Sequence, residues 1–111
     1  MKSHLFKLEG HEVVPVNNVY DWCDWMDAGN LTVDWTTVDG FGVSTCFLGL
    51  APPESRDGPP LLFETVLMRG QRLVRLLERY TTWDDAEKGH KKWTQAVRDK
   101  RVSLMSTQSV N

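Results

Sequence analysis

Apolar and polar residues alternate along much of the middle of the chain. Residues 31–36 alternate strictly, and 41–50 is rich in β-branched and aromatic residues; both patterns predict strands. Asp39 and Gly40 between them are a hairpin signal. The second half of 41–50 is apolar on both faces, which indicates a central strand covered by a helix on one side and by another element on the other.

Two further strands are predicted after a loop at 51–60, which contains four prolines. We predict a strand over 61–69, a tight turn at 70–71 and a last strand over 73–81. The periodicity of 73–81 fits a helix or a strand, and we favour a strand because the turn before it resembles a hairpin. Strict alternation would place Leu73, Arg75, Leu77 and Arg79 on one face and Val74, Leu76, Glu78 and Tyr80 on the other.

The N-terminal part predicts a hairpin followed by a short helix. Residues 4–16 form two apolar stretches around a glycine, which is typical of a hairpin. Asn17 or Asn18 can cap a helix that ends before Gly29. The apolar stripe of this helix would be Val19, Trp22, Cys23 and Met26.

An amphipathic helix is predicted to close the domain, with Thr82 as its cap. Its apolar face would consist of Trp83, Ala86, His90, Trp93 and Val97. Gly89 costs such a helix about 1 kcal/mol relative to Ala, so we expect it to permit close approach to the sheet. The prediction is a single α+β domain over 1–102 and a flexible tail over 103–111. It is an antiparallel sheet of about four to six strands, with a short N-terminal helix and the C-terminal helix packed on it.

Composition is that of an ordinary globular protein, with 41% hydrophobic and 25% charged residues among 111. No apolar run approaches the roughly 20 residues of a membrane span, and the N-terminus lacks the features of a secretory signal. We therefore expect a cytoplasmic protein, in bacteria or in a host cell infected by its carrier, that does not contact membranes. In that reducing compartment the two cysteines, Cys23 and Cys46, are expected to be small buried residues.

Charge is uneven along the chain: the net charge is −3 over 1–30, −4 over 31–64 and +5 over 65–111. This polarity favours an electrostatically guided contact with a partner. The acidic candidates for that contact are Asp21, Asp24 and Asp27, which share one side of the first helix. The basic candidates are Arg69, Arg72, Arg75, Arg79, Lys88, Lys91 and Lys92. Arg75 and Arg79 would share a strand face and line a surface with the helix lysines. Both sets also fit an ordinary solvated surface.

Five tryptophans are many for this length. We expect most of them in the core and one on a binding surface, since Trp is enriched at interaction hot spots. Trp25 is the one that we include among the partner-binding candidates.

Catalytic chemistry has few candidates in the sequence. The histidines have no spacing typical of a zinc site, and no phosphate-binding glycine loop or nucleophile elbow is present. A Cys46–His90 pair across a sheet–helix interface is conceivable. However, a histidine on an apolar helix face is more often packed and hydrogen-bonded than catalytic. We predict no catalytic residues, metal or cofactor.

Several sequence blocks within residues 35–90 form a recognisable series. They are Trp35-Thr36, Asp39-Gly40, Val43-Ser44-Thr45, Phe47-Leu48-Gly49-Leu50, Pro60-Leu61-Leu62-Phe63-Glu64-Thr65 and Arg79-Tyr80-Thr81-Thr82-Trp83 with Ala86 and Gly89-His90. In their order, these blocks resemble a family of small uncharacterised phage and prophage proteins. Members of the family often carry an Asp-His pair after the Leu-Gly-Leu block, where this chain has Ala51-Pro52. The resemblance implies a phage or mobile-element origin.

The leading hypothesis is a non-enzymatic phage or mobile-element protein that inhibits a host defence system, such as a CRISPR complex, through protein–protein contact. The alternative is a small nucleic-acid or nucleotide-binding protein that uses the basic C-terminal half. Against that alternative, the sequence pI is about 5.9 and no nucleic-acid reader motif is present. A third hypothesis is a small enzyme or metal protein around Cys46 and His90.

Overall fold

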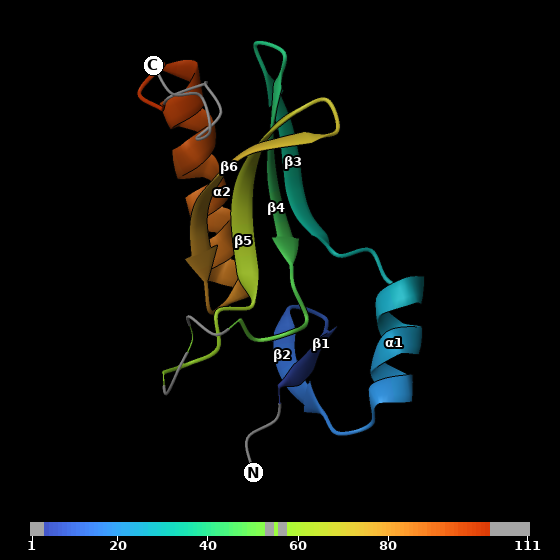
Figure 1. Cartoon of the computed structure of the whole chain (residues 1–111). Helices are drawn as coiled ribbons and strands as arrows, with labels where there is room; N and C mark the ends of the chain where they lie inside the picture. The colour runs from blue at the N-terminus through green and yellow to red at the C-terminus, as the bar shows by residue number, and fades with distance from the viewer. Residues whose placement is uncertain (1–3, 53–54, 56–57, 103–111) are drawn as a thin grey trace.

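A computed structural model describes residues 4–52, 55 and 58–102, and the tail predicted over 103–111 lies outside these described residues. Within them the chain forms an α+β fold of two helices and two antiparallel sheets (Figure 1). The elements are β1 (Leu5–Glu9), β2 (Glu12–Val16), α1 (Val19–Ala28), β3 (Thr32–Val38), β4 (Phe41–Phe47), β5 (Phe63–Arg69), β6 (Arg72–Tyr80) and α2 (Trp83–Arg98). One sheet is the β1–β2 hairpin, and the other, the main sheet, has the order β3-β4-β5-β6. The predicted fold class is confirmed, including the strand over 73–81.

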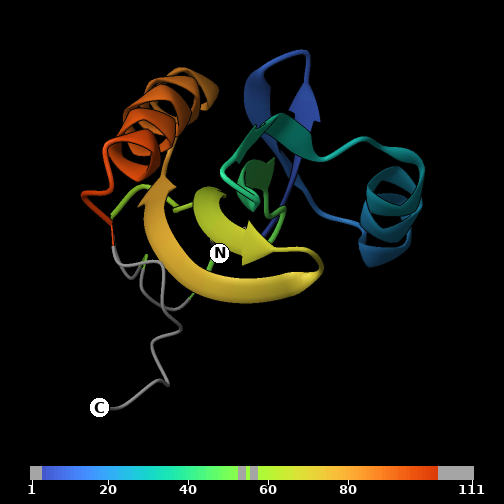
Figure 2. The same ribbon diagram turned by 90° about the horizontal axis from the view of Figure 1, so that it is seen from above.

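Helix α2 lies against one face of the main sheet, as the view from above shows (Figure 2). It begins at Thr82, whose hydroxyl accepts the Asp85 N–H at 3.1 Å. The predicted apolar face is confirmed: its members are buried or half-buried. A Cβ on Gly89 would overlap the Tyr80 ring, so this glycine does allow the helix to approach the sheet closely.

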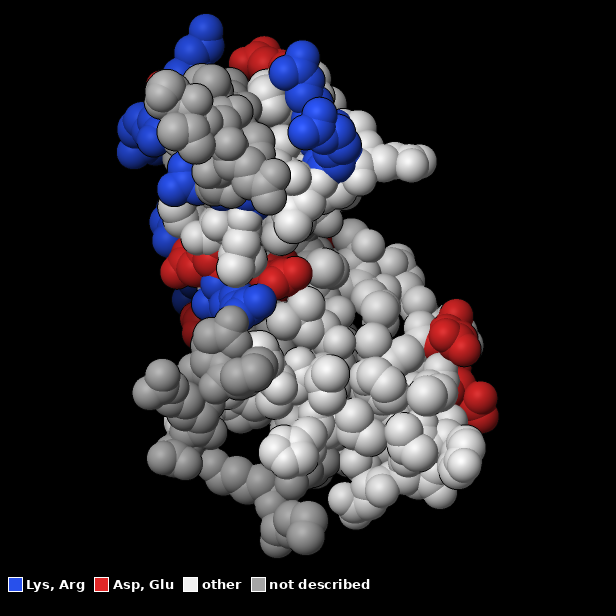
Figure 3. Space-filling view, viewed as in Figure 1, with Lys and Arg blue, Asp and Glu red and all other residues white. Residues whose placement is uncertain are grey.

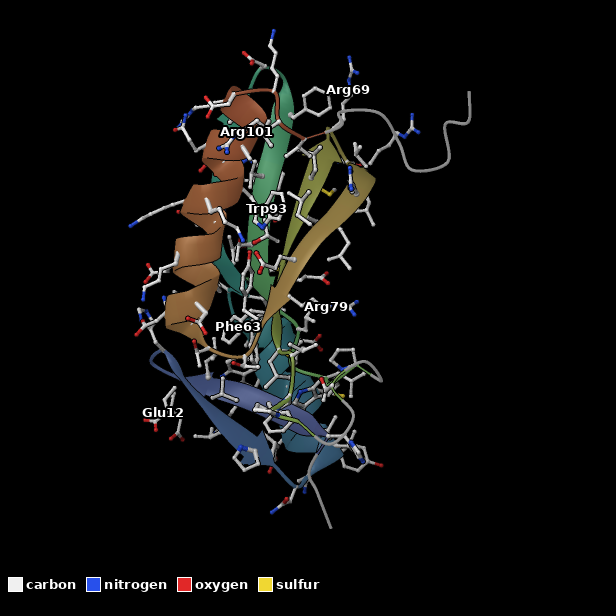
Figure 4. All side chains as sticks on the ribbon, turned by 90° about the vertical axis from the view of Figure 1, so that its left-hand side faces the viewer. Glu12, Phe63, Arg69, Arg79, Trp93 and Arg101 are labelled. Carbon is white, nitrogen blue, oxygen red and sulfur yellow. The ribbon has the colours of Figure 1, made fainter. Side chains whose placement is uncertain are left out.

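The core beneath α2 is divided into two apolar clusters. One contains Val38, Phe41, Val43, Leu67, Ala96 and Val97, and the other contains Phe47, Leu62, Phe63, Tyr80 and Ala86. Figure 4 shows Phe63 and Trp93 at two different heights between α2 and the main sheet. Three buried polar residues, Thr45, Thr65 and His90, also lie between α2 and the sheet. They make the polar chain described below.

The β1–β2 hairpin and α1 form a second layer at the lower end of an elongated molecule, whose extents are 44 × 25 × 23 Å. The Trp22 indole Nε1 donates to the carbonyl oxygens of Phe6 and Gly49, both at 3.1 Å. The Phe6 N–H also donates to the Gly49 oxygen, at 2.8 Å. These bonds attach the hairpin and α1 to the segment that follows β4.

The stripe predicted for α1 is wrong in part. Val19 and Cys23 are exposed, whereas Trp22, Trp25 and Met26 are half-buried. The reason is that α1 packs mainly on the hairpin, with Trp25 reaching Phe47 of β4, which turns a different side of the helix inward. The expectation of buried cysteines is therefore wrong for Cys23. Cys46 is half-buried, and neither cysteine forms a disulfide.

Two predictions for the main sheet also need correction. Strand β4 ends at Phe47 instead of Leu50; Gly49 then adopts a left-handed φ of 75°. Besides α2, the hairpin and α1 pack at this end of the main sheet, around Phe47 and Phe63, in the same cluster as Ala86 of α2. An element that covers the opposite face of β4 does not appear among the described helices and strands. The described residues contain no helix with the length and apolar character needed to cross a membrane.

Candidate partner-binding surface

The face of the main sheet turned away from α2, here called the open face, carries exposed apolar side chains. Antiparallel pairing sets Trp35, Ser44, Val66 and Leu76 side by side across the four strands. The same pairing sets Thr37, Gly42, Met68 and Leu73 in the next row. Trp35 is 49% exposed, Leu73 60% and Leu76 43%. Large apolar side chains gathered on one face are typical of a contact surface.

Gly42 determines how Trp35 lies on this face. A Cβ on Gly42 would come within 2.8 Å of the Trp35 Cη2 atom, so the indole ring lies directly over the glycine. The Trp35 Nε1 also donates to the Thr37 hydroxyl at 3.4 Å. The ring is thus held flat against the sheet, with about half of its surface left for a partner.

The sequence predicted one exposed tryptophan but pointed to Trp25 instead. Trp25 is half-buried and sits edge-on to Phe47, with ring centroids 5.7 Å apart. Trp35 is exposed because the pairing shifts between Thr32 and Asp34. This bulge changes the alternation that would otherwise keep Trp35 on the same face as Val33. The presence of an exposed tryptophan was predictable from composition, whereas its position was not.

Two arginines lie at the β5–β6 turn, beyond the end of the open face, and their pairing next to Met68 and Leu73 directs both toward the α2 side of the sheet. The Arg69 guanidinium lies over the Phe41 ring, 5.2 Å from its centroid. Arg72 is exposed at the first position of β6. The space-filling view shows the basic side chains gathered at this end of the molecule (Figure 3), and Figure 4 shows Arg69 there.

Arg75 and Arg79 do not share a strand face, contrary to the prediction. The β5–β6 register shifts twice, between Thr65 and Val66 and between Leu67 and Met68. Each shift is a bulge that interrupts strict alternation. Arg79 therefore lies opposite Glu64, to which its Nε donates at 3.3 Å, while Arg75 lies opposite Leu67.

The helix lysines Lys88, Lys91 and Lys92 are exposed on α2, which covers the other face of the main sheet. The Lys92 Nζ donates to the Glu78 carboxylate at 2.6 Å, and the Trp93 Nε1 donates to the same oxygen at 2.8 Å. Burial alone would raise the pKa of Glu78, but these hydrogen bonds outweigh it and lower the pKa. The basic candidates are thus divided between two surfaces, and some are neutralised by carboxylates.

The acidic candidates Asp21, Asp24 and Asp27 are all exposed on α1. This helix lies at the opposite end of the molecule from the β5–β6 turn (Figure 1). The acidic side chains over α1 are visible in Figure 3. The charge polarity of the sequence therefore becomes a polarity along the length of the folded protein.

A chain of hydrogen bonds runs beneath α2 across all the strands of the main sheet. His90, only 2% exposed, bonds the Thr36 hydroxyl through Nε2 at 2.8 Å and the Thr45 hydroxyl through Nδ1 at 2.7 Å. The chain continues from Thr45 to Thr65 at 2.6 Å and from Thr65 to the Tyr80 hydroxyl at 3.0 Å. Burial lowers the pKa of His90 and raises the pKa of Tyr80 to about 12. These groups are therefore held neutral as a structural network.

Cys46 and His90 do not form the conceivable catalytic pair. Thr45 points to His90, and adjacent residues of a strand point to opposite faces, so Cys46 lies on the open face opposite Glu64. Burial and the Glu64 charge raise the pKa of the Cys46 thiol, which disfavours the reactive thiolate. The described residues also contain no group of His, Cys, Asp or Glu side chains arranged to hold a metal ion.

Comparisons of the chain with known protein families, curated proteins and solved structures find no match. Within the described residues, the feature best suited to binding is the open face. It presents Trp35, Leu73 and Leu76 on a rigid sheet, and Arg69 and Arg72 lie beyond it at the β5–β6 turn.

Proposed function

We propose that this chain is a non-enzymatic binding protein that contacts a protein partner through the open face. The observation that carries the proposal is the exposed Trp35 ring, held over Gly42 beside exposed Leu76. A rigid aromatic anchor loses little conformational freedom on binding and is typical of the centre of an interface. The partner would present an apolar patch to Trp35 with acidic side chains toward Arg69 and Arg72.

A protein partner suits this face better than a nucleic acid. Leu73, Leu76 and Met68 are aliphatic, and such side chains pair with apolar protein surface and not with phosphates. The open face also carries a carboxylate, Glu64, which is bonded to Arg79. An extended phosphate backbone would need a continuous row of cations, which this face does not provide.

The class of partner comes from the resemblance to small phage and prophage proteins. Small phage proteins that act by binding often occupy a surface of a host defence effector, and a CRISPR complex is the target that we propose first. On this proposal the protein inhibits the effector by covering a functional surface of it.

Trp35→Ala should weaken partner binding by about 30-fold or more, because a central tryptophan is worth about 2 kcal/mol or more at an interface. Gly42→Ala should also weaken binding, because the new methyl group displaces the Trp35 ring. Tyr20→Ala is the matched control, since Tyr20 is 78% exposed on α1, away from the open face. Two measurements are made for each variant. One is its inhibition of purified CRISPR effectors, and the other is its affinity for the proteins of an infected host that the unmodified protein retains.

A partner that Trp35→Ala binds as well as the unmodified protein would refute the open face as the contact surface. Nucleic-acid binding is tested separately by titration with single- and double-stranded DNA and RNA at two salt concentrations. Affinity that falls steeply with salt and depends on Arg69 and Arg72 would favour the nucleic-acid alternative instead.

A further inference from the structure

The outer edge of β3 is a stretch of backbone that no described strand joins. β3 and β6 are the two edge strands of the main sheet (Figure 1). Two bulges interrupt β6, and bulges turn an edge away from further pairing. In β3 the register shift lies between Thr32 and Asp34, and the pairing with β4 is continuous from Asp34 to Val38. Residues 34–38 therefore form the edge of the main sheet that is better suited to pair with another strand.

Two residues of this edge turn their backbone groups away from β4. Asp39 and Gly40, with φ of 51° and 84°, form the two-residue turn that joins β3 to β4. The residues that flank such a turn form a hydrogen-bonded pair, and hydrogen-bonded and non-hydrogen-bonded pairs alternate along antiparallel strands. Counted back from the turn, Trp35 and Thr37 fall in non-hydrogen-bonded pairs, so their N–H and C=O groups point outward.

A hydrogen bond of Trp35 supports this orientation. Its backbone N–H donates to the Asp34 Oδ1 at 2.8 Å, whereas an N–H directed into the ladder would donate to β4. The pairing with β4 leaves the Trp35 carbonyl oxygen and both backbone groups of Thr37 without a strand partner, and Thr37 is exposed. Unpaired donors and acceptors along an edge are a template for the backbone of another chain.

The Trp35 ring does not block this edge. The ring lies over Gly42 of β4, and its Nε1 donates to the Thr37 hydroxyl at 3.4 Å, so it leans toward the sheet and not outward. Side chains of a strand alternate between the two faces of a sheet. A strand paired with β3 would therefore turn every second side chain to the open face, beside the indole.

We propose that the protein partner adds an extended strand to the β3 edge along residues 34–38. The proposal rests on the proposed function, because the same partner contacts the open face. Backbone hydrogen bonds to Trp35 and Thr37 hold the added strand, and one of its apolar side chains packs against the Trp35 indole. The Trp35 N–H exchanges the Asp34 Oδ1 for a carbonyl oxygen of the partner, so Asp34 caps the edge in the free protein and yields it on binding.

The test uses a random library of short linear peptides displayed on phage, selected on the unmodified full chain. We expect enriched peptides to carry apolar residues at alternate positions, as a strand beside Trp35 requires. A synthetic copy of an enriched peptide should slow hydrogen exchange of the Thr37 amide, followed by NMR. Enrichment of no such peptide, or of peptides that leave exchange of the Thr37 amide unchanged, would overturn the inference.

Two variants at one position isolate the backbone bond. Thr37→Val and Thr37→Pro both remove the hydroxyl that accepts from Trp35, but only Thr37→Pro removes the outward N–H, and proline is tolerated in an edge strand at such a position. Thr37→Pro should bind the selected peptide about tenfold more weakly than Thr37→Val, as loss of one hydrogen bond implies. Equal affinity of the two folded variants would contradict the added strand. Asp34→Ala removes the competing cap and should tighten peptide binding, and weaker binding would contradict the exchange.

The same variants separate this inference from the proposed function. If the open face is correct and the edge is not, Trp35→Ala loses the host proteins that the unmodified protein retains, while Thr37→Pro and Thr37→Val retain them equally. If the open face is wrong, Trp35→Ala retains them unchanged. Self-association of the unmodified protein in sedimentation, abolished by Thr37→Pro and not by Thr37→Val, would show that a second copy occupies the edge and would overturn the assignment to another protein.

Discussion

His90 is a titratable residue buried in the core, with only 2% of its surface exposed. Both ring nitrogens bond threonine hydroxyls, at 2.8 and 2.7 Å. Burial lowers its pKa, and the nearby Asp34 carboxylate only partly opposes this effect. The folded protein therefore resists protonation of His90, whereas the unfolded chain takes up this proton below about pH 6.5.

Stability should fall as the pH drops below about 6.5, because the unfolded state then binds more protons than the folded state. The slope attributable to His90 is at most about 1.4 kcal/mol per pH unit, and it should vanish in His90→Gln. Denaturant unfolding between about pH 7 and pH 5 isolates this effect, since the Glu78 pKa lies lower still. The control His4→Gln, at an exposed position, should keep the slope. A flat profile in the unmodified protein would contradict the prediction.

Single residues differ in how far they could be predicted from the sequence. His90 was expected to be a packed, hydrogen-bonded histidine because it falls on the apolar stripe of a strong amphipathic helix, and this is confirmed. Its threonine partners could not be predicted, because they come from separate strands whose register is set only by the assembled sheet. Trp35 was missed for a related reason, since a bulge in β3 decides which face it occupies.

At the scale of elements, the contact between α2 and β6 depends on Gly89. In an open helical position Gly→Ala stabilises by up to about 1 kcal/mol. Here the added methyl would overlap the Tyr80 ring, so we expect Gly89→Ala to destabilise the protein by about 1–3 kcal/mol, the usual cost of overpacking. Chemical denaturation measures the change, with the exposed neighbour Lys88→Ala as control. Increased stability of Gly89→Ala would show that the helix does not press on the ring.

Elements were predicted best where the local sequence alone defines them. The cap at Thr82, the turn at Asp39 and Gly40 and the turn at 70–71 are local signals, and the structure confirms each. The faces of β6 were wrong because two bulges interrupt the strand as it curves across the sheet. The buried side of α1 was wrong because the partner of the helix is a hairpin, which its own periodicity cannot reveal.

At the scale of the whole molecule, opposite charges lie at opposite ends of a body 44 Å long. The aspartates Asp21, Asp24 and Asp27 lie on α1, and Arg69 and Arg72 lie at the β5–β6 turn next to the open face. Exposed charges act mainly on the rate of encounter and are screened by salt over about 10 Å. The two ends should therefore be separable by experiment, because only one of them adjoins the proposed contact surface.

Charge reversal at Arg69 and Arg72, to Glu, should slow association with the partner about tenfold at low salt, and this difference should shrink as salt is raised. Reversal of Asp21 and Asp24 to Lys should leave the rate nearly unchanged or increase it, because α1 is remote from the open face and an acidic partner would be drawn to added positive charge. Stopped-flow or surface-binding kinetics at two ionic strengths measure both rates.

The opposite result, in which only the α1 reversal slows association, would place the contact at the acidic end and require a basic partner. Because the reversals alter exposed side chains, folding of each variant can be checked independently by its thermal unfolding, and a loss of rate in a folded variant reports on the interface itself.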